Sequence, residues 1–131
     1  MQTINLNTSS RTEFVNITQE VRRMVTELGL KEGVAIVYAP HTTAGMTINE
    51  AADNDVVLDI NRKLSQLVPS HNGYHHLEGN SDAHIKASLM GSSIQVIISE
   101  GGLMLGQWQG IFFCEFDGPR RRKVYVKILG E

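Results

Sequence analysis

The stretch Trp108–Leu129, WQGIFFCEFDGPRRRKVYVKIL, decides the fold of this 131-residue chain. In its first half, the even-numbered positions include Trp108, Phe112, Cys114 and Phe116. The other parity carries Ile111 and Phe113, so this half predicts a strand that is buried on both faces. After Gly118-Pro119, residues 122–129 alternate again, with Val124, Val126 and Ile128 pointing inward. Strands joined by short turns favour a largely antiparallel or mixed sheet.

The periodicity of the remaining sequence predicts three helices and further strands. Alternation or short apolar runs predict strands over 2–7, 33–39 and 94–99. Apolar stripes at helical spacing predict helices over 18–28, 53–68 and 82–90, with Asp53 as a cap and Pro69 as a stop. Strands that gather toward the C-terminal end favour an α+β fold over a doubly wound one. We expect a single domain over residues 1–131, with a mostly antiparallel or mixed sheet.

Composition limits the class of protein. The chain has 41% hydrophobic and 20% charged residues and a net charge of −2, which disfavours both disorder and a nucleic-acid coat. No apolar run approaches the roughly 18 residues of a membrane span. The first residues show no signal-peptide pattern, and Cys114 is the single cysteine. We expect a cytoplasmic protein that binds neither nucleic acid nor membrane.

Histidines form the strongest chemical signal. Four of the five lie between residues 71 and 84, and the fifth, His41, opens a segment of small polar residues. Imidazole is a preferred ligand of divalent metals, above all zinc, where no thiolate is available. We therefore expect His41, His76 and His84 to hold a divalent metal, with zinc the favoured ion. His71 and His75 stay unassigned.

Three carboxylates accompany these histidines as catalytic candidates. Asp82 or Glu78 can orient an imidazole or act as a base on bound water, and Glu50 is a further candidate for that base. The alternative is that the histidines are solvated loop residues and that Asp82 caps a helix. No HExxH or CxxC motif is present, so spacing alone leaves both readings open.

Other polar residues indicate binding of a small anionic substrate. Arg120 and Arg122 share one side of an extended segment, and guanidinium groups suit phosphate. Trp108 and Gln109 offer a stacking face and an amide to a planar heterocycle. Thr42, Thr43 and Asn49 follow His41 and predict a polar pocket beside it. The alternatives are a solvated strand start for the arginines, a core position for Trp108, and a helix start at Asn49 and Glu50.

Three ordered blocks of sequence resemble the YjbQ-like family. They are His41-Thr42-Thr43-Ala44-Gly45 through Glu50, Tyr74-x-His76 through Lys86, and Gly106-x-Trp108-Gln109-Gly110-Ile111 through Arg120. Some members of that family are regarded as secondary thiamine-phosphate synthases. The resemblance implies an α+β fold, a homo-trimer, and a histidine-rich metal site near a subunit interface.

Three functions remain open at this point. The first is a thiamine-phosphate-synthase type of enzyme acting on small phosphorylated metabolites, in which Arg120, Arg122 and the metal stabilise the departing diphosphate. The second is a zinc-dependent hydrolase of a small phosphorylated or carboxylated compound. The third is a metal- or metabolite-binding trimer without enzymatic activity.

Overall fold

A computed structural model describes residues 1–130. Its eight strands and three helices follow in the order β1 (Gln2–Asn7), β2 (Glu13–Asn16), α1 (Thr18–Leu28), β3 (Gly33–Tyr38), β4 (Ala44–Glu50), α2 (Asn54–Leu67), α3 (Ser81–Met90), β5 (Ser93–Ser99), β6 (Gly102–Leu103), β7 (Gln109–Glu115) and β8 (Arg121–Gly130). The α+β class and the three helices are confirmed. The short strands β2 and β6 were not predicted, because four and two residues are too few to show periodicity.

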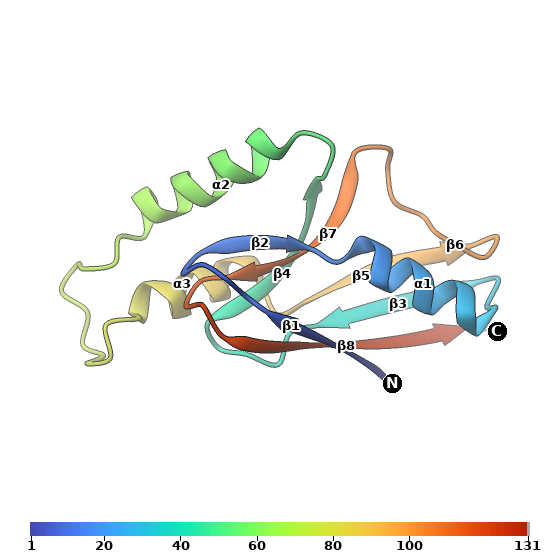
Figure 1. The fold of residues 1–131 in the computed structure, drawn as a ribbon, viewed down its shortest axis with the longest axis horizontal. Coiled ribbons are helices and arrows are strands. Elements are labelled where there is room, and N and C mark those ends of the chain that lie inside the picture. Colours follow the sequence, from blue (N-terminus) through green and yellow to red (C-terminus); the bar gives the residue numbers. More distant parts are fainter. Residues whose placement is uncertain (131) are drawn as a thin grey trace.

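Two antiparallel sheets form the body of the molecule. The larger sheet has the order β1-β8-β3-β5-β6, and the smaller has the order β2-β7-β4. The smaller sheet and α1 lie over one face of the larger sheet (Figure 1). The two C-terminal strands belong to different sheets: β7 lies in the centre of the smaller sheet, and β8 pairs with β1 and β3 in the larger one.

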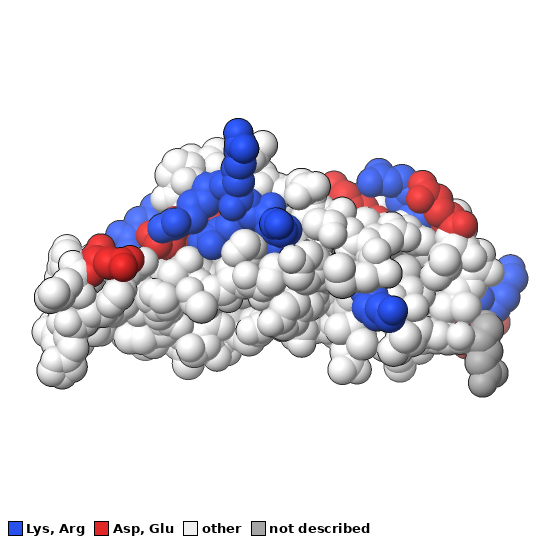
Figure 2. All heavy atoms as spheres, turned by 90° about the horizontal axis from the view of Figure 1, so that it is seen from below, with Lys and Arg blue, Asp and Glu red and all other residues white. Residues whose placement is uncertain are grey.

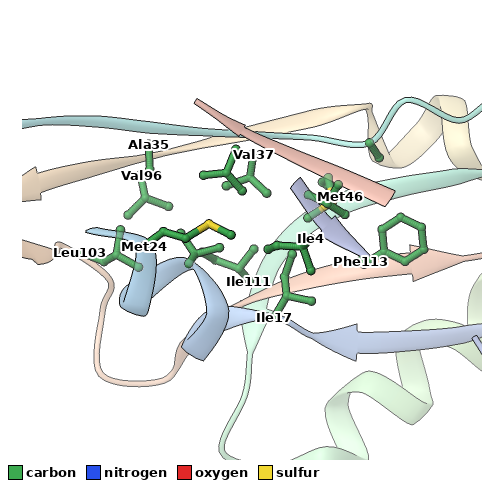
Figure 3. Close-up of a cluster of buried hydrophobic side chains, with 14 of the residues drawn as sticks. Ile4, Ile17, Met24, Ala35, Val37, Met46, Val96, Leu103, Ile111 and Phe113 are labelled. Carbon is green, nitrogen blue, oxygen red and sulfur yellow. The ribbon is translucent and has the colours of Figure 1, made fainter. Parts of the chain in front are cut away.

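The two parities of β7 serve two separate cores, as the sequence predicted. Ile111 and Phe113 pack toward the larger sheet and α1, in the cluster that Figure 3 shows. Phe112, Cys114 and Phe116 pack on the opposite side, against Val57 of α2 and the alanines of α3. The smaller sheet is therefore a middle layer between the larger sheet and the helices α2 and α3. The end of β7 lies where all three layers meet.

Two helix starts differ in how they are capped. Asp53 caps α2 as predicted, and its Oδ1 accepts a hydrogen bond from the Asp55 N–H at 3.0 Å. Helix α3 begins one residue earlier than expected, after Asn80, whose side chain makes no capping bond. Asp82 lies inside the first turn of α3 and is buried. Its carboxylate serves a different purpose from a cap, described below.

Candidate functional site

A buried ion pair joins the two sheets where β7 ends and β8 begins. Arg122 of β8 donates from Nε to Oε2 of Glu115 at 2.7 Å and from Nη2 to Oε1 at 2.5 Å. The Thr8 hydroxyl and the Asp117 N–H donate to the same carboxylate at 2.8 and 2.9 Å. Burial by itself raises the pKa of Glu115, but these hydrogen bonds outweigh it and hold the pKa below its ordinary value. The pair is therefore charged and fully engaged.

Arg122 also holds Thr43, one of the polar residues that the sequence singled out. Its Nη2 donates to the hydroxyl of Thr43 at 2.9 Å, across the gap between β8 and the segment before β4. The guanidinium of Arg122 is hydrogen-bonded to Glu115 and Thr43. Arg122 therefore forms a buried part of the pocket wall and is not a free anion-binding group. Sequence reasoning missed Glu115. The available signal was a lone acidic residue in the apolar run Ile111–Phe116.

His41 lines the same pocket as Arg122 and lies in the turn between β3 and β4. Its Nε2 is 3.0 Å from both the N–H nitrogen and the carbonyl oxygen of Lys123. Burial lowers the pKa of His41, and the nearby Arg122 charge lowers it further. The imidazole is therefore neutral at pH 7. In the tautomer whose Nε2–H donates to the Lys123 carbonyl, Nδ1 is left as a proton acceptor or ligand.

His76 and His84 face each other on the other side of the pocket. His84 projects from the first turn of α3, and His76 comes from the loop before it. Their ring centroids are 5.5 Å apart and the rings are perpendicular. Glu78 approaches the pair, with Oε2 at 3.7 Å from Nε2 of His76. The loop and the start of α3 therefore bring one imidazole each to the same place.

Arg120 provides the accessible positive charge. Its Nε and Nη2 donate to the carbonyl oxygen and Oδ2 of Asp117, at 2.7 and 2.8 Å, and its side chain is 53% exposed. Asn80 Nδ2 donates to the same Oδ2 at 2.9 Å. Within residues 1–130 the buried Oδ1 of Asn80 has no hydrogen-bond partner. Viewed from the β8 side, Lys and Arg side chains gather over the region where this strand begins (Figure 2).

These groups line one polar pocket of about 490 Å³. Its lining includes seven residues that the sequence singled out: His41, Thr42, Thr43, His76, His84, Arg120 and Arg122. They come from three distant segments of the chain, as the three sequence blocks suggested. Glu78, which the sequence offered as an alternative to Asp82, also lines the pocket. So do Asn80 and Asp117, which were not predicted. All three lie within the quoted blocks, beside residues that were chosen.

The remaining predicted site residues lie elsewhere in the chain. Asn49, Glu50, Trp108 and Gln109 line a second, smaller pocket of about 280 Å³, at the far end of β4. The strand carries them roughly 20 Å from the start of β4. The expectation that Asn49 and Glu50 lie beside His41 is therefore wrong within one chain, because an extended strand separates them. Trp108 is 57% exposed, so it is not a core residue either.

Asp82 is buried on the helical side of the molecule. Its Oδ1 is 3.0 Å from Nη2 of Arg11, and its Oδ2 is 3.8 Å from Nζ of Lys86. Lys86 is itself buried, and its ammonium donates to the Ser65 hydroxyl at 3.2 Å. Burial lowers the pKa of Lys86, while the Asp82 charge opposes that effect. In this arrangement Asp82 ties α3 to Arg11 and does not line the polar pocket.

Comparison with known proteins identifies the family. The sequence model for UPF0047 protein YjbQ-like matches residues 2–131. The chain belongs to the YjbQ/UPF0047 family. A UPF0047 protein of Methanocaldococcus jannaschii is 55% identical over 126 residues, which cover 96% of this chain and 91% of the relative. The UPF0047 protein YugU of Bacillus subtilis is 48% identical over 131 residues, covering 99% of both chains.

Solved structures of YjbQ-family proteins share this fold. An uncharacterized family member from Clostridium acetobutylicum has a TM-score of 0.97 and 56% identity, and the match covers 98% of this chain and 100% of that one. A protein of unknown function from Sulfolobus solfataricus has a TM-score of 0.96 at 33% identity, covering 99% and 96%. The family and the fold are therefore established, and neither relative carries a named activity.

The donor set fits a metal only in part. His76 and His84 are close enough to share one ion, since two imidazoles bound to a single tetrahedral zinc have ring centres about 5 Å apart. His41 instead turns Nε2 to the Lys123 backbone. Within residues 1–130, no group of three or more His, Cys, Asp or Glu side chains is placed to hold one metal ion. The arrangement supplies a two-imidazole pair and not a complete three-ligand site.

Proposed function

We propose that the polar pocket binds a small phosphorylated metabolite and that its histidines act on that ligand. The convergence of three histidines and Arg120 from distant segments on one hollow carries this proposal. Arg120 keeps part of its guanidinium open to solvent, and such groups bind phosphate through short charge-assisted hydrogen bonds. The neutral His41 supplies a proton acceptor beside that anion.

Calorimetric titration with methyl phosphate tests the binding step. We expect Arg120→Ala to weaken binding by about tenfold or more, because a charged hydrogen bond is lost. Arg121→Ala is the matched control: Arg121 is the next residue, is exposed, and does not line the pocket. Its affinity should stay within about twofold of the wild type. Equal weakening by both variants would mean that phosphate follows overall charge and not this pocket.

We further propose that His76 and His84 hold a divalent cation, with zinc the favoured ion. Their facing rings support this, and the third ligand expected at His41 requires that ring to leave the Lys123 backbone. Elemental analysis of purified protein is the direct measurement. We expect about one zinc per chain, lost in His76→Ala and His84→Ala and kept in His71→Ala, whose side chain is exposed and outside the polar pocket. Wild-type protein without metal would leave acid–base roles for both histidines.

Two reactions are candidates for this site. A thiamine-phosphate-synthase type of transfer joins a pyrimidine diphosphate to a thiazole phosphate and releases pyrophosphate. Hydrolysis of a small phosphorylated or carboxylated compound is favoured by the neutral His41, which can accept a proton from water. Assays for thiamine phosphate and for released phosphate separate the two. Turnover of neither substrate class would favour a metal- or metabolite-binding role without catalysis.

We also propose that the protein is a homo-oligomer, a trimer, in the cytoplasm. The outer face of the larger sheet supports association, because Tyr38, Ile97 and Leu129 are exposed and alternate along their strands with side chains of the buried core. Cys114 is buried and free, so the fold uses no intrachain disulfide. Within residues 1–130, no helix is long and apolar enough to span a membrane. Mass determination by light scattering, with and without chelator, tests the oligomer and its dependence on metal.

A further inference from the structure

A second hollow adjoins the polar pocket on the other side of His76 and His84. It has a volume of about 470 Å³, and both histidines line it as well as the polar pocket. Tyr74 from the loop before α3 and Ile85 from α3 itself supply most of its remaining apolar wall, and Gly73, His75 and Ser81 complete the lining. The two imidazoles therefore form the boundary between a charged compartment and a mainly apolar one.

The apolar wall is held in place by local structure. The Tyr74 hydroxyl donates to the carbonyl oxygen of Pro69 at 2.5 Å, which fixes the phenol ring over the loop. Gly73 has φ +71°, a conformation that glycine adopts at little cost, so the chain turns there just before Tyr74. Ile85 follows His84 on α3 and keeps 39% of its surface exposed. An exposed isoleucine beside a tyrosine ring gains free energy when an apolar group covers it.

We propose that the ligand of this site is bipartite: an anionic group bound in the polar pocket and a compact apolar group, a ring or a branched chain, bound against Tyr74 and Ile85. This inference rests on the proposed function, since the anionic half is the ligand of the polar pocket. The combined hollows have the size and mixed lining typical of small-molecule sites. The structure thus assigns the flat surface of the site to Tyr74, and not to Trp108, which lies at the other end of β4.

Comparison of phenyl phosphate with methyl phosphate tests the inference. The two esters carry the same anionic group, so any difference in affinity reports the apolar part. We expect phenyl phosphate to bind wild-type protein roughly tenfold more tightly, as partial burial of a ring predicts. Ile85→Ser should abolish most of this preference and leave the affinity for methyl phosphate within about twofold. Ile85 is partly exposed, so the substitution leaves the packed interior intact.

Two further variants make the test specific. Leu89→Ser is the matched control, because Leu89 lies one turn further along α3, is exposed, and does not line the hollow. It should keep the full preference. Tyr74→Leu removes the ring by an independent route and should reduce the preference as Ile85→Ser does. Equal binding of both esters to wild-type protein would overturn the bipartite ligand and leave the proposed function standing. Binding of neither ester would overturn the proposed function and the inference together.

Discussion

Removing Arg122 should destabilise the protein more than any other single change at the site. In Arg122→Met the carboxylate of Glu115, which has no exposed surface, loses both of its guanidinium hydrogen bonds. The Thr8 hydroxyl and the Asp117 N–H remain as its partners. They cannot replace a full positive charge in a site that water does not reach. The change therefore leaves a buried and uncompensated charge between the two sheets.

The expected cost is a large fraction of the total stability. Breaking a buried ion pair from one side costs about 3–5 kcal/mol. A domain of this size has a free energy of unfolding of about 5–15 kcal/mol. The melting temperature should fall by about 9–20 °C, at roughly 3–4 °C per kcal/mol for a chain of this length. Circular dichroism during heating measures the melting temperature. Urea titration, with one slope m fitted to wild type and variant, measures the free energy of unfolding.

Two comparisons make this prediction refutable. Arg121→Met is the control, since Arg121 is exposed and adjacent in sequence, and it should change stability by less than about 0.5 kcal/mol. In the double variant Glu115→Gln/Arg122→Met the buried charge is gone while one acceptor remains. It should recover at least about 1 kcal/mol relative to Arg122→Met alone. A cost below about 1 kcal/mol for Arg122→Met, or no recovery in the double variant, would refute the reasoning.

Three further predictions follow from the same structure. Asp82→Ala removes the carboxylate beside the buried Lys86 and should destabilise the protein by about 3 kcal/mol in urea titration, whereas a solvated catalytic carboxylate would leave stability unchanged. Trp108→Ala should cost less than about 1 kcal/mol and leave methyl phosphate affinity unaltered, because Trp108 is exposed and outside the polar pocket. Stability should fall on acidification in two stages. The first begins below about pH 6.5, because the pKa of His41 is lower in the fold than in the unfolded chain, which therefore takes up the proton first. The second begins below about pH 4.5, because the pKa of Glu115 is lowered in the fold in the same way. Melting curves from about pH 8 to about pH 2.5 cover both stages, and His41→Gln should remove the first stage alone.

The sequence by itself determined the three helices, the longer strands and the buried faces of these elements. The two parities of Ile111–Phe116 reported correctly that β7 is covered on both sides. The Asp53 cap and the Pro69 stop placed α2 within a residue of its observed ends. These features succeed because alternation, capping and proline geometry are local properties of the backbone, which a neighbouring strand does not change.

The sequence also selected most of the polar pocket from side-chain chemistry. Imidazole, hydroxyl and guanidinium groups were chosen because of what they bind, and the fold brings His41, His84 and Arg120 to one hollow. Side-chain chemistry alone did not show which of the chosen groups are already hydrogen-bonded to other residues of the protein. The partner of Arg122 is Glu115 on another sheet, and that pairing depends on how β7 and β8 pack.

Only the tertiary structure decided which candidates share a site. Glu50 has the carboxylate expected of a base, and Trp108 has the flat ring expected of a stacking surface. Both nevertheless line a different pocket, because they lie at the far end of β4. Likewise, Tyr74 and Ile85 become a surface beside the histidines only once the loop 70–80 folds against α3. Residue type and spacing fix what a side chain can do and which way it points within its own element. Its neighbours are set by long-range pairing, because strand order and layer packing join segments that the sequence keeps far apart.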